Sequence, residues 1–233
     1  MRLVYINPNA TETMTRGIVA AARAALPGVE ISGMTNLAGP AAIEGPEDGE
    51  AALPGLLACV AQARDAGASA IVIACFDDTG LADTRARAGC PVLGIGQSAY
   101  VMATLLGLRF SVVTSLPVSV PVIRQNVEAG GFGGFCASIR ASGLAVLTID
   151  EAGDATRARI AEEIAAARDD DGAEAVILGC AGMAPMAGDL ATRSGVRLVD
   201  GVAASAHLAA AAAGFSASQG GPAQALSRAR QQP

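Results

Sequence analysis

The chain has 233 residues, of which 52% are hydrophobic and 3% aromatic, and its formal net charge is −6. This length suits one large α/β domain or two small lobes, and the acidic balance argues against a nucleic-acid-binding surface. All sixteen basic residues are arginines, so no lysine amine can form an internal Schiff base with pyridoxal phosphate.

Short apolar strands alternate with amphipathic helices along the chain. Asn9 is the expected N-cap of the first helix, with Glu12 three residues later. The predicted elements, in chain order, are a strand at 3–6, a helix at 11–26, a strand at 29–34, a helix at 50–66, strands at 71–75, 91–95 and 109–115, a helix at 118–129, a strand at 144–149, a helix at 155–168, strands at 175–180 and 196–200, and a helix at 202–213. This alternation predicts parallel sheets covered by helices.

An internal repeat indicates that the chain is built from two similar halves. GASAIVIAC at 67–75 matches GAEAVILGC at 172–180, and RLVYIN at 2–7 aligns with RFSVVT at 109–114. We therefore expect an α/β fold of two similar Rossmann-like lobes, related by a pseudo-twofold axis, with the active site in the cleft between them. The predicted boundaries are 1–97 plus 202–215 for the first lobe, 98–201 for the second lobe, and 216–233 for a disordered tail.

Cysteine usage and the N-terminus indicate a cytoplasmic protein with free thiols. The number of cysteines is odd and no CxxC pair occurs, so the sequence predicts neither a disulfide framework nor a metal site. The N-terminus lacks a signal-peptide pattern, and no apolar run reaches the roughly 20 residues of a membrane span. The five cysteines are Cys59, Cys75, Cys90, Cys136 and Cys180.

Cys75 and Cys180 occupy equivalent positions of the repeat, each at the carboxyl end of an apolar strand. Ligands of open α/β sheets bind beyond these strand ends, so facing lobes would offer one thiol from each side of a cleft. Two opposed thiols suit removal of a proton from one face of a carbon and its return to the other face. This chemistry requires one thiolate and one thiol, and hence lowered thiol pKa values. The plainer alternative is that both cysteines are small core residues, as we expect of Cys59, Cys90 and Cys136.

Several segments resemble the hydantoin racemase group of the aspartate/glutamate racemase superfamily. They are INPN (6–9), IEG (43–45), IACFDDTGL (73–81), PVLGIGQSA (91–99) and LGCAGM (178–183). The resemblance implies a two-lobed isomerase that needs no cofactor and uses Cys75 and Cys180 as its two bases. It also implies substrate-binding residues in the strand-end loops, namely Asn7, Pro8, Asn9, Phe76, Asp77, Asp78, Thr79, Thr114, Ser115, Ala181, Gly182 and Met183.

The residues that follow the two cysteines depart from the amino-acid racemases of this superfamily. Those enzymes typically follow their cysteines with Asn-Thr and Thr-His, whereas Phe76-Asp77 and Ala181-Gly182 stand here. A neutral cyclic ureide, such as a 5-substituted hydantoin, therefore fits better than an amino acid. Allantoin and an Asp/Glu-type amino acid remain the alternative substrates. Decarboxylases of the superfamily use one cysteine, so the presence of two favours racemisation.

Three other functions compete with a racemase. Gly94, Gly96 and Ala99 fit a variant of the dinucleotide fingerprint. Cys180 and His207, the only histidine, could form a cysteine hydrolase pair. A binding protein with the same lobes would take up a small molecule without changing it. The alanine-rich helix at 202–213 also suggests that copies of the chain associate into a homo-oligomer.

Overall fold

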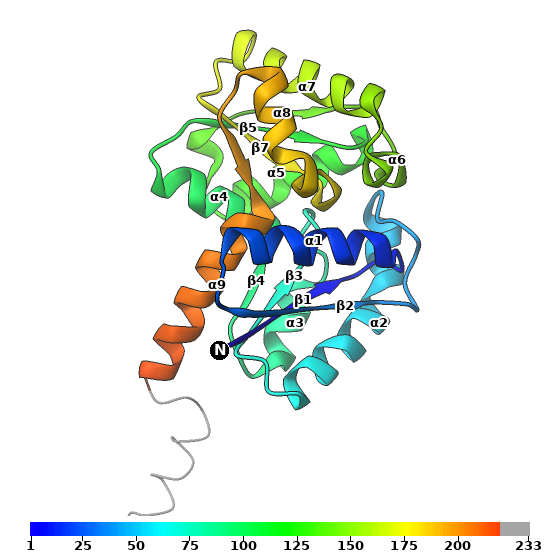
Figure 1. The fold of residues 1–233 in the computed structure, drawn as a ribbon, viewed down its shortest axis with the longest axis vertical. Coiled ribbons are helices and arrows are strands. Elements are labelled where there is room, and N and C mark those ends of the chain that lie inside the picture. The colour runs from blue at the N-terminus through cyan, green and yellow to red at the C-terminus, as the bar shows by residue number, and fades with distance from the viewer. Residues whose placement is uncertain (220–233) are drawn as a thin grey trace, which may run out of the picture.

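The computed structural model describes residues 1–219, which form two lobes stacked on one another (Figure 1). Each lobe contains a four-stranded sheet whose strands all run parallel. The strand order is β2-β1-β3-β4 in the first sheet and β6-β5-β7-β8 in the second. The same order in both sheets confirms the two similar α/β lobes that the repeat predicts.

The first sheet and its helices come from the N-terminal part of the chain. The elements are β1 (Arg2–Asn7), α1 (Glu12–Ala25), β2 (Glu30–Thr35), α2 (Pro46–Asp65), β3 (Ala70–Ile73), α3 (Leu81–Ala88), β4 (Val92–Gly94) and α4 (Ile95–Leu105). Leu56 and Val60 of α2 pack against Ile71 and Ile73 on one face of the sheet. The other face belongs to an apolar core that continues into the second lobe.

The second sheet and its helices come from the following part of the chain. Its elements are β5 (Phe110–Thr114), α5 (Val120–Ala129), β6 (Cys136–Ala141), α6 (Val146–Glu151), α7 (Asp154–Asp169), β7 (Ala175–Gly179), α8 (Ala187–Ser194) and β8 (Leu198–Asp200), with short 3-10 turns η1 (Pro117–Ser119), η2 (Gly133–Phe135) and η3 (Ala181–Met186). Every residue of β5 and β7 is buried. Neither strand therefore alternates between buried and exposed residues, as is typical of strands covered on both faces.

The last helix, α9 (Gly201–Ser218), returns from the second sheet to the first. It packs against α1, α4, β1 and β3, and Figure 1 shows it beside the first sheet. The Tyr5 hydroxyl of β1 lies 2.9 Å from Ser205 Oγ and donates to the Val202 carbonyl oxygen at 3.2 Å. Within the described part of the chain, α9 contains no stretch apolar enough to cross a membrane, and neither does any other helix.

Four expectations differ from the structure. Residues 144–149 were expected to form a strand, but α6 begins at Val146 there, and the second sheet takes β6 instead. The spacing of Val146 and Ile149, the two buried residues of α6, is helical rather than alternating. The structure also adds the helices α3, α4 and α8, which the predicted elements lack, and it places the N-cap of α1 at Thr11 instead of Asn9. Finally, α9 continues beyond residue 215 to Ser218, while residues 220–233 of the expected tail lie outside the described part.

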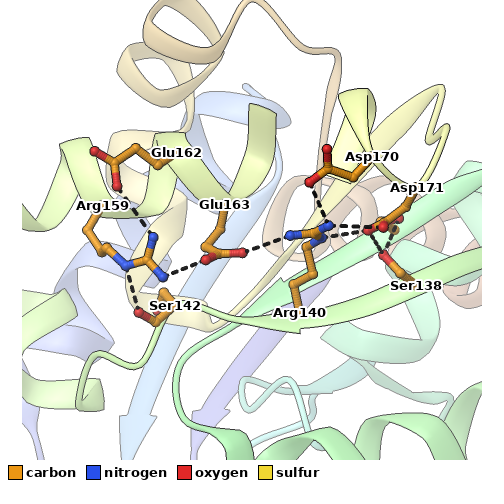
Figure 2. Close-up of polar contacts among 9 residues, drawn as sticks. Ser138, Arg140, Ser142, Arg159, Glu162, Glu163, Asp170 and Asp171 are labelled. Carbon is orange, nitrogen blue, oxygen red and sulfur yellow. Dashed lines mark hydrogen bonds and ion pairs between the residues drawn. The ribbon is translucent and has the colours of Figure 1, made fainter. Parts of the chain in front are cut away.

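Arg140 joins the edge strand β6 to the end of α7 (Figure 2). Its guanidinium lies between Glu163 on one side and Asp170 and Asp171 on the other, with Nε 2.5 Å from Asp171 Oδ2. The Ser138 hydroxyl donates to the same carboxylate at 2.5 Å. Hydrogen bonding to Arg140 lowers the pKa of Asp171.

We expect Arg140→Ala to lower the free energy of unfolding by about 1–3 kcal/mol, because it leaves partly buried carboxylates without their cation. The matched control is Arg87→Ala, whose ion pair with Asp83 is about half exposed and should contribute little. Urea titrations at pH 7 measure both variants. The loss caused by Arg140→Ala should shrink as the pH falls through the lowered pKa of Asp171, and equal effects of the two variants would contradict this role.

Candidate active site

A cavity lies where the carboxyl ends of the two sheets face each other. It contains about 370 Å³ of space free of atoms, its opening to solvent included, so it is a narrow cavity that suits a small ligand. Its lining residues are Asn9, Met14, Ile43, Ala74, Cys75, Phe76, Asp77, Thr114, Ser115, Ser119, Val146, Gly179, Cys180 and Ala181.

Each lobe delivers one cysteine to this cavity from the strand that the repeat predicts. Cys75 comes two residues after the end of β3, and Cys180 directly follows β7. Both strands lie inside their sheets, so their carboxyl ends point to the same cleft. Cys180 is 8% exposed, and Cys75 is half-buried. The two thiols therefore line one cavity from separate sheets.

Matching backbone groups contact the two sulfur atoms. Against the larger effect of burial, the backbone of Asp77 lowers the pKa of the Cys75 thiol and the backbone of Gly182 lowers that of the Cys180 thiol. In both cases the donor stands two residues after the cysteine. The Thr79 hydroxyl adds a third donor, 3.5 Å from Cys75 Sγ. These groups favour the ionised form of each sulfur.

Burial nevertheless outweighs these donors. Burial raises the pKa of the Cys180 thiol to about 12, and it raises that of Cys75 well above the ordinary value. The Asp77 carboxylate also raises both pKa values. The expectation of lowered thiol pKa values is therefore wrong for the unliganded protein, because a thiolate loses its hydration in this cavity.

Iodoacetamide should inactivate the protein slowly at pH 7, because only the thiolate is a good nucleophile. The inactivation rate should rise about tenfold per pH unit from pH 7 to pH 10, since the fraction of thiolate grows in that proportion below the pKa. Peptide mass spectrometry should assign the modification that tracks inactivation to Cys75 or Cys180. A rate that levels off near pH 8 would show that one thiol ionises readily.

Asp77 is the charged side chain that faces the two thiols. Burial raises the pKa of its carboxyl to about 6, and a hydrogen bond from the Ser119 side chain lowers it. The Asp77 carbonyl oxygen accepts from Asn126 Nδ2 of α5 at 2.9 Å, across the lobes. The backbone of Asp77 is therefore held between the lobes, and its side chain lines the cavity.

The structure gathers only part of the predicted site, the two cysteines included, around the cavity. Eight predicted residues line the cavity: Asn9, Cys75, Phe76, Asp77, Thr114, Ser115, Cys180 and Ala181. Six others do not: Asn7, Pro8, Asp78, Thr79, Gly182 and Met183. Asn7 instead holds its own loop together by donating to Asn9 Oδ1 at 2.8 Å and to Thr15 Oγ1 at 3.0 Å.

Six residues of the cavity lining are absent from the predicted site: Met14, Ile43, Ala74, Ser119, Val146 and Gly179. Met14 lies in α1 and accepts a 3.3 Å hydrogen bond from Asn9 Nδ2 at its sulfur. Ile43 stands in the IEG segment, so the family resemblance alone could have suggested it. Val146 begins α6, where its backbone N–H donates to Glu44 Oε1 of the other lobe at 2.7 Å. Cross-lobe contacts such as this one have no signal in the sequence.

Two of the competing functions lack the geometry that they need. A dinucleotide phosphate would bind the amides at the start of α4, but the Gly96 and Gln97 N–H groups donate to the Asp78 carboxylate at 3.0 and 2.7 Å. His207 is exposed on α9, and it is not among the residues that line the cavity with Cys180. The glycine motif therefore does not leave its amides free for a phosphate, and Cys180 and His207 do not share the cavity.

Comparison with known proteins agrees with this arrangement. The family model of Asp/Glu/Hydantoin racemases matches residues 3–209. A hydantoin racemase of Rhizobium meliloti is 41% identical over 92% of this chain and 89% of its own, and one of Pseudomonas sp. (strain NS671) is 37% identical over 90% and 84%. The structure of an allantoin racemase from Klebsiella pneumoniae superposes with a TM-score of 0.87 at 37% identity, covering 92% of this chain and 88% of that one. The chain is thus an isomerase that belongs to the Asp/Glu/Hydantoin racemase family.

Proposed function

We propose that the protein is a cofactor-independent, two-base racemase that inverts the α carbon of a 5-substituted hydantoin through Cys75 and Cys180. The observation that carries the proposal is the pair of thiols at repeat-equivalent strand ends, which line one narrow cavity from separate sheets. The thiolate of one cysteine removes the proton at C5, and the thiol of the other gives a proton to the opposite face. After the step, thiol and thiolate have exchanged places.

The charge of the cavity favours a neutral ring over an amino acid. Among the described residues, no arginine or histidine lines the cavity, while the Asp77 carboxylate does. A substrate carboxylate would meet this negative charge without a cation to pair with. A ureide ring offers N–H groups to Asp77 and a carbonyl group to the Ser115 hydroxyl, while the Thr114 hydroxyl donates to the Gly179 carbonyl oxygen at 2.9 Å.

Ring binding also supplies the thiolate that catalysis needs. Asp77 raises the pKa of both thiols, and a ring N–H that donates to Asp77 offsets its charge. Binding of the substrate therefore lowers the cost of ionising Cys75 or Cys180. A thiolate that is costly to form is also a strong base toward a carbon acid.

Allantoin is the second candidate, because an allantoin racemase has the same fold at 37% identity. The apolar lining formed by Met14, Ile43, Phe76 and Val146 favours hydantoins with an apolar substituent over the polar ureido group of allantoin. A homo-oligomer in the cytoplasm stays a prediction from the sequence.

Polarimetry on single-enantiomer substrates tests the proposal. The protein, first dialysed against a chelator, should racemise 5-alkyl and 5-arylalkyl hydantoins faster than allantoin, and it should leave aspartate and glutamate unchanged. Uncatalysed racemisation of each ring is subtracted. Binding of these hydantoins without any change of optical rotation would indicate a binding protein instead, and racemisation of glutamate would refute the argument from charge.

A further inference from the structure

Asp78 belongs to the loop at 74–80 that contains Cys75, which we call the Cys75 loop, but its carboxylate caps α4. Its Oδ1 accepts from the Gly96 N–H at 3.0 Å, and its Oδ2 accepts from the Gln97 N–H at 2.7 Å. Asp78 does not line the cavity, although the adjacent Asp77 does. The two neighbouring carboxylates thus have different environments, one in the cavity and one at the start of a helix.

Glycines make room for this contact. A Cβ at Gly94 would lie 1.9 Å from Asp78 Oδ1, and a Cβ at Gly96 would lie 2.3 Å from the Phe76 carbonyl oxygen. Asp78 itself has a φ of 52°, which non-glycine residues seldom adopt. The Cys75 loop and the start of α4 therefore pack so closely that no side chain fits at residues 94 and 96.

The other lobe shows what Asp78 replaces. There Asp200, the residue just before α9, caps its own helix by accepting from the N–H groups of Val202 and Ala203 at 3.0 and 3.2 Å. Gly94 holds the equivalent place before α4. In both lobes the capped amides stand two and three residues further on. The first lobe thus obtains the same cap from a catalytic loop instead of from the helix's own N-cap residue.

We propose that Asp78 is a positioning residue that sets the place of Cys75 relative to Cys180, an inference that rests on the proposed two-cysteine function. The Cys75 carbonyl oxygen accepts from the Asp78 N–H at 3.1 Å. This hydrogen-bonded turn fixes the backbone of Cys75 relative to that of Asp78. Helix α4 in turn packs against β7, the strand that delivers Cys180. Asp78 thereby connects the Cys75 loop to the element that positions the other thiol.

The first test compares Asp78→Asn with Asp200→Asn, which removes the matched cap. The asparagine side chain can accept from one backbone N–H through its oxygen. Its NH2 group faces the second backbone N–H and cannot accept from it, so both variants weaken a helix cap. We expect kcat for a 5-substituted hydantoin to fall about 10- to 100-fold in Asp78→Asn, because small misplacements of a reacting group have such effects. Asp200→Asn should keep kcat within about twofold. Equal changes in kcat would overturn the proposal.

The second test moves the cap to where the other lobe has it. The double variant Asp78→Gly/Gly94→Asp supplies a local carboxylate to α4 and removes the clash at residue 94. Its thermal stability should recover relative to Asp78→Gly, while kcat stays low because the loop remains unanchored. Recovery of kcat together with stability would show that Asp78 is only a helix cap.

A third measurement does not depend on turnover. The ratio of iodoacetamide labelling of Cys75 to that of Cys180, measured by peptide mass spectrometry, should change at least threefold in Asp78→Asn and stay unchanged in Asp200→Asn. If the wild-type protein racemises no hydantoin, the proposed function fails, but this ratio still tests the position of the loop. An unchanged ratio in Asp78→Asn would overturn the positioning role alone.

Discussion

Replacing either Cys75 or Cys180 by alanine should abolish racemisation, with a loss of at least about 10³-fold in kcat. Proton transfer by a positioned group contributes about 10²–10⁴-fold, and half of a two-base pair cannot complete an inversion. The control is Cys90→Ala, which removes a half-buried thiol that is not among the residues lining the cavity. This variant should keep kcat within about twofold.

Isotope exchange in D2O tests the same pair more sharply. With one pure enantiomer as substrate, the product of the wild-type enzyme should carry deuterium from the earliest time points. The remaining substrate should stay largely protiated, because the returning proton comes from the opposite side. Each alanine variant retains one base, so each should exchange one enantiomer only, and the two variants should prefer opposite hands. Early labelling of both enantiomers by the wild-type enzyme, or racemisation by either variant, would show that a single base operates.

Gly179→Ala should lower the free energy of unfolding by about 1–3 kcal/mol, as overpacked core positions do. A Cβ there would lie 2.7 Å from the Val113 carbonyl oxygen and 2.9 Å from Thr114 Cα, and these backbone atoms of β5 cannot rotate away. Gly179 immediately precedes Cys180, so relief of the clash displaces the thiol. We therefore expect kcat to fall more than tenfold as well.

Gly188→Ala in α8 is the matched control for this substitution. No atom lies within 4 Å of the added Cβ, and alanine is the better helix former, so the variant should be as stable as the wild type or slightly more stable. Thermal unfolding followed by circular dichroism measures both variants. A wild-type melting temperature for Gly179→Ala would show that β5 and β7 can separate without cost.

The repeat explains why so much of the architecture can be predicted from the sequence. Two buried strands with nearly the same residues, each followed by a cysteine, predict two similar sheets, and the structure has them. The strand expected at 144–149 fails because its branched residues suit either state. A contact from outside the segment supports the helix, because the Glu44 carboxylate accepts from the first N–H of α6.

The site was less predictable than the fold, because neighbouring residues in a turn point in opposite directions. Asp77 and Asp78 look alike in the sequence, yet one lines the cavity and the other caps α4. The burial of the thiols also has no local signature. Their raised pKa values arise because both lobes bury them. The periodicity of apolar residues predicts helices and strands, but it does not predict which residues are buried between two lobes.

The return of α9 to the first sheet determines when that sheet can be completed during synthesis. Its Tyr5 hydroxyl contacts Ser205 and Val202, which leave the ribosome about 200 residues later. Until then the apolar face around Leu3 and Tyr5 lacks the helix that covers it. The first lobe therefore cannot complete its packing before the second lobe has been synthesised, unlike a domain whose core is contiguous in sequence.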